Sequence, residues 1–150
     1  MTQKDLKEFI NKMQEFHPIA VKHFQIGDPN KFFGFNITLQ QYLALDILVS
    51  RNKCKMTDLS KDLGIKLSTA TGLVDRLIKR HFAKRERDTE DRRLVWIYPT
   101  QTGIKIDKKI KEIKENHVSK ILRKITQNDR DNLIRIIEKI TKVVKELGEK

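Results

Sequence analysis

The segment RERDTEDRR, residues 85–93, combines four arginines with four carboxylates. Arginine is the side chain that enters narrow, electronegative minor grooves of DNA, and a carboxylate can fix the aim of a guanidinium through a two-bond pair. The apolar run LVWIYP that follows favours a β-strand and stops at Pro99. Residues 82–99 therefore predict a two-stranded hairpin whose charged tip contacts DNA. The alternative is an ordinary solvated hairpin.

The charged side chains of this hairpin fall into two groups. The arginines that could contact DNA are Arg85, Arg87, Arg92 and Arg93. The carboxylates that could orient them are Asp88, Glu90 and Asp91.

A helix, a tight turn and a second helix are expected immediately before the hairpin. Thr57 can cap a short helix over residues 58–63, which Gly64 would end, because helices commonly stop at a left-handed residue. The run STATGLVDRLIKR, residues 68–80, predicts the second helix. Its expected inward residues are Ala70, Leu73, Val74 and Leu77. A helix-turn-helix followed by a basic hairpin is an arrangement that reads DNA, with the second helix in the major groove.

The outward face of this second helix supplies the candidate recognition residues, Ser68, Thr69, Thr71, Gly72, Arg76 and Lys79. Hydroxyl groups near a helix start can bond phosphates or base edges, and Arg76 could take a guanine or a phosphate. The competing interpretation for each residue is the solvated face of a surface helix.

Helices are expected on both sides of this unit. Residues 2–24 and 100–125 show apolar residues three or four apart, with a kink expected at Pro18. Thr38 with Gln41, and Thr126 with Asp129, have the spacing of capping boxes that would open helices. A short strand is expected at residues 54–56. The last helix carries a nearly pure apolar stripe: Leu133, Ile136, Ile137, Ile140, Val143, Val144 and Leu147. Either the chain's own core or a second copy could cover such stripes, and a helical homodimer is the favoured reading.

Composition narrows the classes of binding partner and chemistry that fit this chain. The 150 residues carry a formal net charge of +12, which implies nucleic acid, an anionic membrane or simply a lysine-rich source. A single cysteine excludes an intrachain disulfide, and the absence of a long apolar run argues for a cytoplasmic protein. The histidines are scattered and Cys54 has the character of a small buried hydrophobe, so no metal or cofactor is expected. No catalytic constellation can be assembled, so no enzyme is expected.

The run LSKDLGIKLSTATGLVDRLIKRHFAKRERDTEDRRLVWIYPTQTG, residues 59–103, resembles the MarR family of dimeric winged helix-turn-helix transcriptional regulators. The resemblance lies in a leucine-glycine turn, a Ser/Thr-rich recognition helix ending in LVDRL, a wing with D-x-x-D-R-R, and T-x-x-G after a strand. It departs from the family at His81, where glycine is usual, at Gly72, where a larger polar residue is common, and at Pro99, where leucine is usual.

The resemblance implies a role for individual residues. Asp91 would orient the wing, Arg93 would enter the minor groove with Arg92 beside it, and the terminal helices would interlock two subunits. The family's effectors include phenolic or lipophilic acids. The aromatic residues that could line a ligand cavity between the dimer helices and the DNA-binding lobe are Phe9, Phe16, Phe24, Phe35 and Tyr42. Plain core and loop packing is the alternative for them.

These inferences combine into one expected architecture and function. The fold is mainly α with a small β-hairpin wing, in a single MarR-type domain over residues 1–150. Residues 38–99 form the winged helix-turn-helix lobe, with the helix-turn-helix at about 57–80 and the wing at about 82–99, and residues 1–24 and 100–150 form dimerisation helices. The expected function is a homodimeric repressor that binds a pseudo-palindromic double-stranded DNA operator under control of a small hydrophobic or phenolic effector. The alternative is a winged-helix module that binds a protein or RNA.

Overall fold

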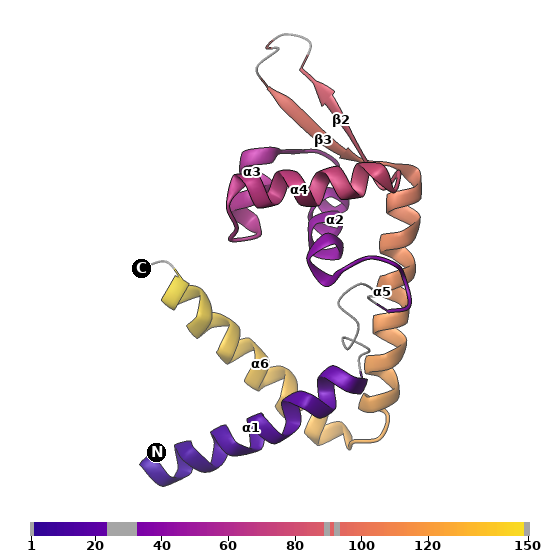
Figure 1. Ribbon diagram of the computed structural model, residues 1–150. Helices are drawn as coiled ribbons and strands as arrows, with labels where there is room; N and C mark the ends of the chain where they lie inside the picture. The colour runs from indigo at the N-terminus through magenta and orange to yellow at the C-terminus, as the bar shows by residue number, and fades with distance from the viewer. Residues whose placement is uncertain (1, 24–32, 89–90, 92–93, 149–150) are drawn as a thin grey trace. The chain divides into compact units, whose positions relative to one another are not determined.

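The computed structural model describes residues 2–23, 33–88, 91 and 94–148 (Figure 1). The chain divides into two compact units, Met1–Ile113 and Lys114–Lys150. The helices of the described part are α1 (Gln3–His23), α2 (Leu39–Arg51), α3 (Met56–Asp62), α4 (Leu67–Lys79), α5 (Gln101–Leu122) and α6 (Gln127–Gly148). Its strands are β1 (Cys54–Lys55), β2 (Ala83–Arg87) and β3 (Val95–Pro99).

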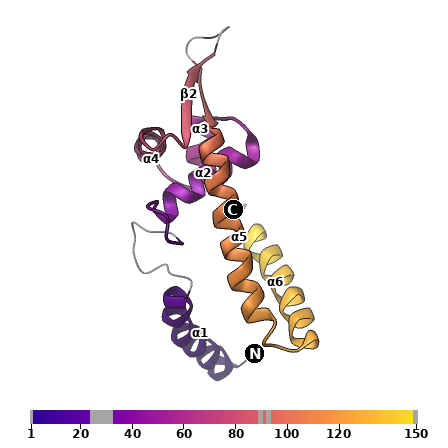
Figure 2. The same ribbon diagram turned by 90° about the vertical axis from the view of Figure 1, so that its right-hand side faces the viewer.

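The strands form one antiparallel sheet in the order β1-β3-β2. Strand β2 pairs with β3 from Ala83 opposite Pro99 to Arg87 opposite Val95, and β1 adds Cys54 opposite Ile97 on the other side of β3. The expected strand at residues 54–56 is thus present, but the expected two-stranded hairpin is a three-stranded sheet. Figure 2 shows strands β2 and β3 projecting beyond helices α2, α3 and α4, which is the shape of a wing.

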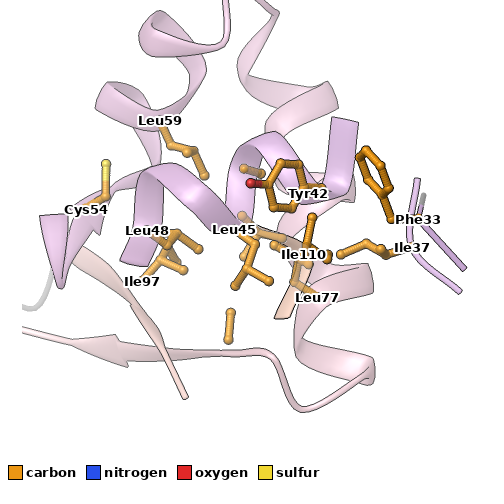
Figure 3. Close-up of a cluster of buried hydrophobic side chains, with 13 residues drawn as sticks. Phe33, Ile37, Tyr42, Leu45, Leu48, Cys54, Leu59, Leu77, Ile97 and Ile110 are labelled. Carbon is orange, nitrogen blue, oxygen red and sulfur yellow. The ribbon is translucent and has the colours of Figure 1, made fainter. Parts of the chain in front are cut away.

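Helices α2, α3, α4 and α5 and the sheet share one hydrophobic core. Figure 3 shows Tyr42, Leu45 and Leu48 of α2 in a cluster with Ile97 of β3 and Ile110 of α5. The inward residues expected on α4 are confirmed as buried: Ala70, Leu73, Val74 and Leu77. Their spacing of three and four residues leaves the opposite face of α4 to solvent.

Local sequence signals set several helix ends. The Thr38 hydroxyl accepts the backbone N–H of Gln41 at 3.2 Å, and the Gln41 side chain accepts the backbone N–H of Thr38 at 3.1 Å, which confirms that capping box. Thr126 and Asp129 make the same reciprocal pair at 3.2 and 3.3 Å. Helix α5 ends at Leu122, three residues before its expected end at residue 125.

The expected cap at Thr57 is wrong. Helix α3 begins two residues earlier than expected, at Met56, and its N-cap is Lys55, which bonds no helix N–H through its side chain. Lys55 also ends strand β1, so the chain passes from sheet to helix without a loop. The expected helix end is confirmed, because Gly64 has a φ of +62° and its N–H donates to the carbonyl of Lys61.

The junction between wing and α5 depends on a close backbone approach. The Thr100 hydroxyl donates to the carbonyl of His81 at 2.5 Å and accepts the N–H of Gly103 at 3.0 Å, so it caps α5 and anchors it to the turn after α4. A Cβ on Gly103 would lie 2.1 Å from the carbonyl oxygen of Phe82, so only glycine fits there. His81 has a φ of +58°, a conformation that histidine tolerates better than most residues. The cap by Thr100 and the close backbone approach at Gly103 explain the T-x-x-G pattern.

Helices α1 and α6 expose their apolar stripes in the single chain. On α1, Phe9 and Phe16 are about 60% exposed, and Pro18 lies inside the helix, which continues past it to His23. On α6 the exposed apolar residues are Leu133, Ile134, Ile136, Ile137, Ile140, Val143, Val144 and Leu147. No residue of α6 is buried. A face of this size calls for a partner surface.

Candidate nucleic-acid interface

The solvent face of α4 is polar and basic over its whole length. Ser68 and Thr69 in the first turn and Arg76 and Lys79 in the last turns are exposed. Thr71 is half-buried, and its hydroxyl donates to the carbonyl of Leu67 at 2.9 Å, so it is held against the helix backbone. The helix therefore presents hydroxyl groups near its start and cations near its end, which suits base edges and phosphates.

Gly72 lies in the middle of this face and leaves it open. A Cβ at this position would lie 3.8 Å from the guanidinium Nη1 of Arg76, which is ordinary contact distance. The guanidinium of Arg76 thus lies beside the bare backbone of Gly72. A backbone without a side chain can approach a nucleic acid closely, whereas Arg76 supplies the hydrogen-bond donors of this turn.

An ion pair joins the wing to α4. The Arg85 Nη2 atom on β2 lies 3.0 Å from the Asp75 Oδ1 atom on α4, and both side chains are partly exposed. Arg85 lies opposite the buried Ile97 in the sheet register, so its side chain is on the face turned toward the helices. The sequence predicts that Arg85 contacts DNA and does not predict a pairing with Asp75. The pair shows that Arg85 also fixes the hairpin against the helix.

The hairpin tip is described only in part. Arg87 and Asp91 are exposed, and Arg92 and Arg93 lie outside the described residues. Asp88 connects the strand ends: its Oδ2 accepts the indole N–H of Trp96 at 2.8 Å, and its Oδ1 accepts the backbone N–H of Asp91 at 3.1 Å. Asp88, which was expected to orient arginines, therefore also connects Trp96 to the backbone of Asp91.

Basic residues gather on the outer face of the sheet. Lys53 and Lys55 place their ammonium groups 4.5 and 5.2 Å from the centre of the Trp96 ring, and Lys84 lies 5.4 Å from the Tyr98 ring. Lys84 also pairs with Glu86 at 2.6 Å, a hydrogen bond that raises the pKa of Lys84. The sequence held a signal for this face, because residues 84, 86, 96 and 98 alternate with inward positions along their strands.

A charged cluster lies where α5 meets α2. Lys111 of α5 bonds Asp46 of α2 at 2.7 Å and Asp107 at 2.8 Å. Burial opposes the charged ammonium, but the hydrogen bonds to the two carboxylates raise the pKa of Lys111 above its usual range. Asp107 is only 2% exposed, and its Oδ1 has no hydrogen-bond partner among the described residues. Burial raises the pKa of the neighbouring Tyr42 to about 12, and Asp46 and Asp107 reinforce the shift.

The aromatic residues considered for an effector cavity lie in different environments. Tyr42 is buried in the core, Phe35 is half-buried against it, and Phe9 and Phe16 are exposed on α1. Phe24 lies outside the described residues. Two surface hollows are lined by other side chains: one by Gln3, Lys4, Leu6, Lys7 and Ile10, the other by Thr102, Lys105, Ile106, Lys108, Lys109 and Glu112.

The structure also bears on thiol chemistry, metal binding and membrane insertion. Cys54 is buried, as expected for a small hydrophobe, and burial raises the pKa of its thiol, which disfavours the reactive thiolate. Across the described ranges no group of three or more histidine, cysteine or acidic side chains is placed to hold a metal ion. The helices of those ranges also lack the length and apolar content that crossing a membrane would require.

Sequence comparison matches residues 37–95 to the MarR family. An 81-residue stretch is 35% identical to YfiV, an uncharacterised HTH-type transcriptional regulator of Bacillus subtilis, and covers 54% of this chain. The match spans only about half the length of that relative, 51%. A second B. subtilis HTH-type regulator, YkoM, is 27% identical over 80% of this chain and 76% of its own.

The fold is shared with solved structures. A MarR family protein from Bacillus stearothermophilus superposes with a TM-score of 0.79 at 21% identity, over 97% of this chain and 99% of that one. FabT of Streptococcus pneumoniae, solved in complex with DNA, gives a TM-score of 0.76 at 18% identity over the same shares. The expected class, mainly helical with a winged helix-turn-helix, is confirmed.

Proposed function

Because residues 37–95 match the MarR family, we propose that this chain is a sequence-specific, double-stranded DNA-binding transcriptional regulator of that family. It acts as a homodimeric repressor whose DNA binding is modulated by a small-molecule effector. The observation that carries the proposal is the ion pair between Asp75 and Arg85, which joins an exposed polar helix face to a basic hairpin. Two elements fixed to each other in this way can engage a major groove and the neighbouring backbone or minor groove together.

Helix α4 reads the major groove in this proposal. Arg76 offers a planar set of donors to a guanine or a phosphate, and Ser68 and Thr69 bond phosphates or base edges from the first turn. Lys79 contacts a phosphate, and Thr71 contributes through its hydroxyl oxygen. Gly72 permits close approach of the helix backbone. Support comes from the exposure of this face beside the buried row that holds the helix in the core.

The wing reaches the adjacent minor groove or backbone. Arg93 enters the groove with Arg92 beside it, Arg85 and Arg87 follow the phosphates from strand β2, and Asp91 orients the tip. The high density of guanidinium groups supports this assignment, because arginine is favoured where the minor groove is narrow.

The terminal helices form the dimer. The proposed dimer is supported by the exposed apolar faces of α1 and α6, which a single chain leaves in contact with water. A dimer places two α4 helices on the half-sites of a pseudo-palindromic operator. The effector is a small hydrophobic or phenolic compound, for which Phe9, Phe16, Phe24, Phe35 and Tyr42 remain the candidate residues.

The wing assignment is tested by alanine substitution. Arg93→Ala should weaken operator binding by about 1 to 3 kcal/mol, and Asp91→Ala should weaken it less, because Asp91 acts through the arginines. Fluorescence anisotropy with a labelled operator duplex measures both. Arg135→Ala removes the same charge from a position of α6 outside the apolar stripe and serves as the control. Equal losses for Arg93→Ala and the control would refute the wing assignment.

A further inference from the structure

Trp96, the only tryptophan of the chain, has three polar side chains as partners. Its indole N–H donates to the Asp88 Oδ2 atom at 2.8 Å, a bond that joins β3 to the residue just after β2. Lys53 and Lys55 lie 4.5 and 5.2 Å from the centre of its ring. Since Lys55 also pairs with Trp96 in the sheet, the ring is fixed to β1 as well as to the hairpin.

Asp88 is the second member of this arrangement. Its other oxygen, Oδ1, accepts the backbone N–H of Asp91 at 3.1 Å, while its own N–H donates to the carbonyl of Leu94 at 3.0 Å. The N–H of Leu94 in turn donates to the carbonyl of Asp91 at 2.9 Å. One carboxylate thus connects strand β3, through Trp96, to the backbone at Asp91 in the tip.

The engaged ring of Trp96 also bears on the RNA-binding alternative. A tryptophan that stacks on nucleic-acid bases needs an open ring face. Here the indole N–H is bonded to Asp88, and two ammonium groups lie at the ring. The arrangement suits a side chain that holds other groups in place better than one that receives a ligand.

We propose that Trp96 and Asp88 are positioning residues for the wing, which hold the backbone at Asp91 in place before DNA binds. The proposal rests on the proposed function, because it concerns how the same wing meets DNA. A backbone segment that is already held in place loses less conformational freedom on binding, so its contacts are retained as affinity and as discrimination between operator and random DNA. Neither residue needs to touch DNA for this effect.

Two variants isolate the bond between these residues. Trp96→Phe keeps an aromatic ring for the two lysines and removes the N–H donor, and Asp88→Ala removes both acceptor oxygens. Trp96→Phe should lower operator affinity by about 3- to 10-fold, the effect of one hydrogen bond. Asp88→Ala should lower it at least as much, because it also removes the bond to the backbone N–H of Asp91. The double variant should lose no more than Asp88→Ala alone, because the bond between Asp88 and Trp96 is already absent there. Tyr98→Phe is the matched control: it removes one polar atom from the neighbouring outer aromatic residue and should bind as the wild type does.

The decisive readout is the ratio of operator affinity to random-duplex affinity, measured with and without Arg93→Ala. Positioning predicts that Trp96→Phe lowers this ratio in the wild-type background and has little effect once Arg93 is gone. A loss of the same size in both backgrounds, or wild-type binding by Trp96→Phe, would overturn the proposal. Urea unfolding followed by circular dichroism checks that each variant is folded.

The wild-type measurement separates this proposal from the function on which it rests. A wild-type protein that binds the operator no tighter than random DNA would refute the proposed function itself. A wild type with clear preference, combined with an unaltered ratio in both variants, would refute only the positioning role. The emission of Trp96 gives an independent check, since Asp88→Ala removes the carboxylate at the indole N–H and should change the emission maximum.

Discussion

Arg85 of strand β2 and Asp75 of helix α4 form an ion pair with 3.0 Å between Nη2 and Oδ1. The two residues are ten positions apart, and the pair bridges the two elements that are proposed to meet DNA. Its partial exposure means that water and salt screen it, so it contributes little to stability. Its consequence is geometric, because it limits rotation of the hairpin against the helix.

Single substitutions in this pair should separate its effect on stability from its effect on DNA binding. Arg85→Ala and Asp75→Ala should each change the free energy of unfolding by less than about 1 kcal/mol, as expected for an exposed pair. Arg85→Ala should nevertheless weaken operator binding by about 1 to 3 kcal/mol, since it removes both a cation and the brace. Urea denaturation and anisotropy titrations measure the two quantities. A DNA loss no larger than the stability loss would mean that Arg85 is only structural.

Gly103 of α5 and Gly72 of α4 should respond oppositely to alanine. Gly103→Ala should destabilise the fold by about 1 to 3 kcal/mol or more, because its Cβ would lie 2.1 Å from the Phe82 carbonyl oxygen. Gly72→Ala is the matched control: its Cβ would meet only the flexible Arg76 side chain at 3.8 Å, so it should stabilise α4 by about 0.5 to 1 kcal/mol. Thermal and urea unfolding of both variants compare them. Similar effects at the two positions would contradict the close approach of α5 to the wing.

Alkaline unfolding should depend on Tyr42. Its pKa is raised to about 12 in the folded protein, whereas an unfolded tyrosine loses its proton near the ordinary value of about 10. Between these values the unfolded state binds fewer protons than the folded state, so the free energy of unfolding falls as the pH rises. The raised pKa of Lys111 acts in the same direction. Stability is therefore complete below about pH 10 and declines above it.

Tyr42→Phe should flatten this decline, which is expected to be roughly 2 kcal/mol across the interval. Urea titrations at pH 7 and pH 11 on both proteins measure it, and the pH 7 comparison subtracts whatever the hydroxyl contributes at neutral pH. An equally steep decline in the variant would assign the alkaline transition to other groups.

Local signals made part of the fold predictable from sequence. The capping boxes at Thr38 and Thr126 and the left-handed turn at Gly64 depend on residues within three or four positions, so the sequence pattern contains them. The buried row of α4 follows from helical periodicity. The resemblance around residues 59–103 placed the wing and its order relative to the helices.

The features missed from sequence all involve segments distant in the chain. The pairing of Cys54 with Ile97 turns the hairpin into a three-stranded sheet, and it also moves the start of α3 ahead of Thr57. The 2.1 Å approach behind Gly103 and the pairing of Arg85 with Asp75 are equally tertiary. Residue types alone do not specify such contacts, because many partners would satisfy the same charges and shapes.

Selection of bound duplexes from a random DNA pool, followed by footprinting, tests the central claim most directly. We predict an enriched inverted repeat whose half-site centres lie about 34 Å apart, with affinity that falls steeply as salt rises. Protection should cover both half-sites at once, as two α4 helices of a dimer require. An unenriched pool, or binding that is insensitive to salt and no tighter than to random duplex, would contradict sequence-specific DNA recognition by this chain.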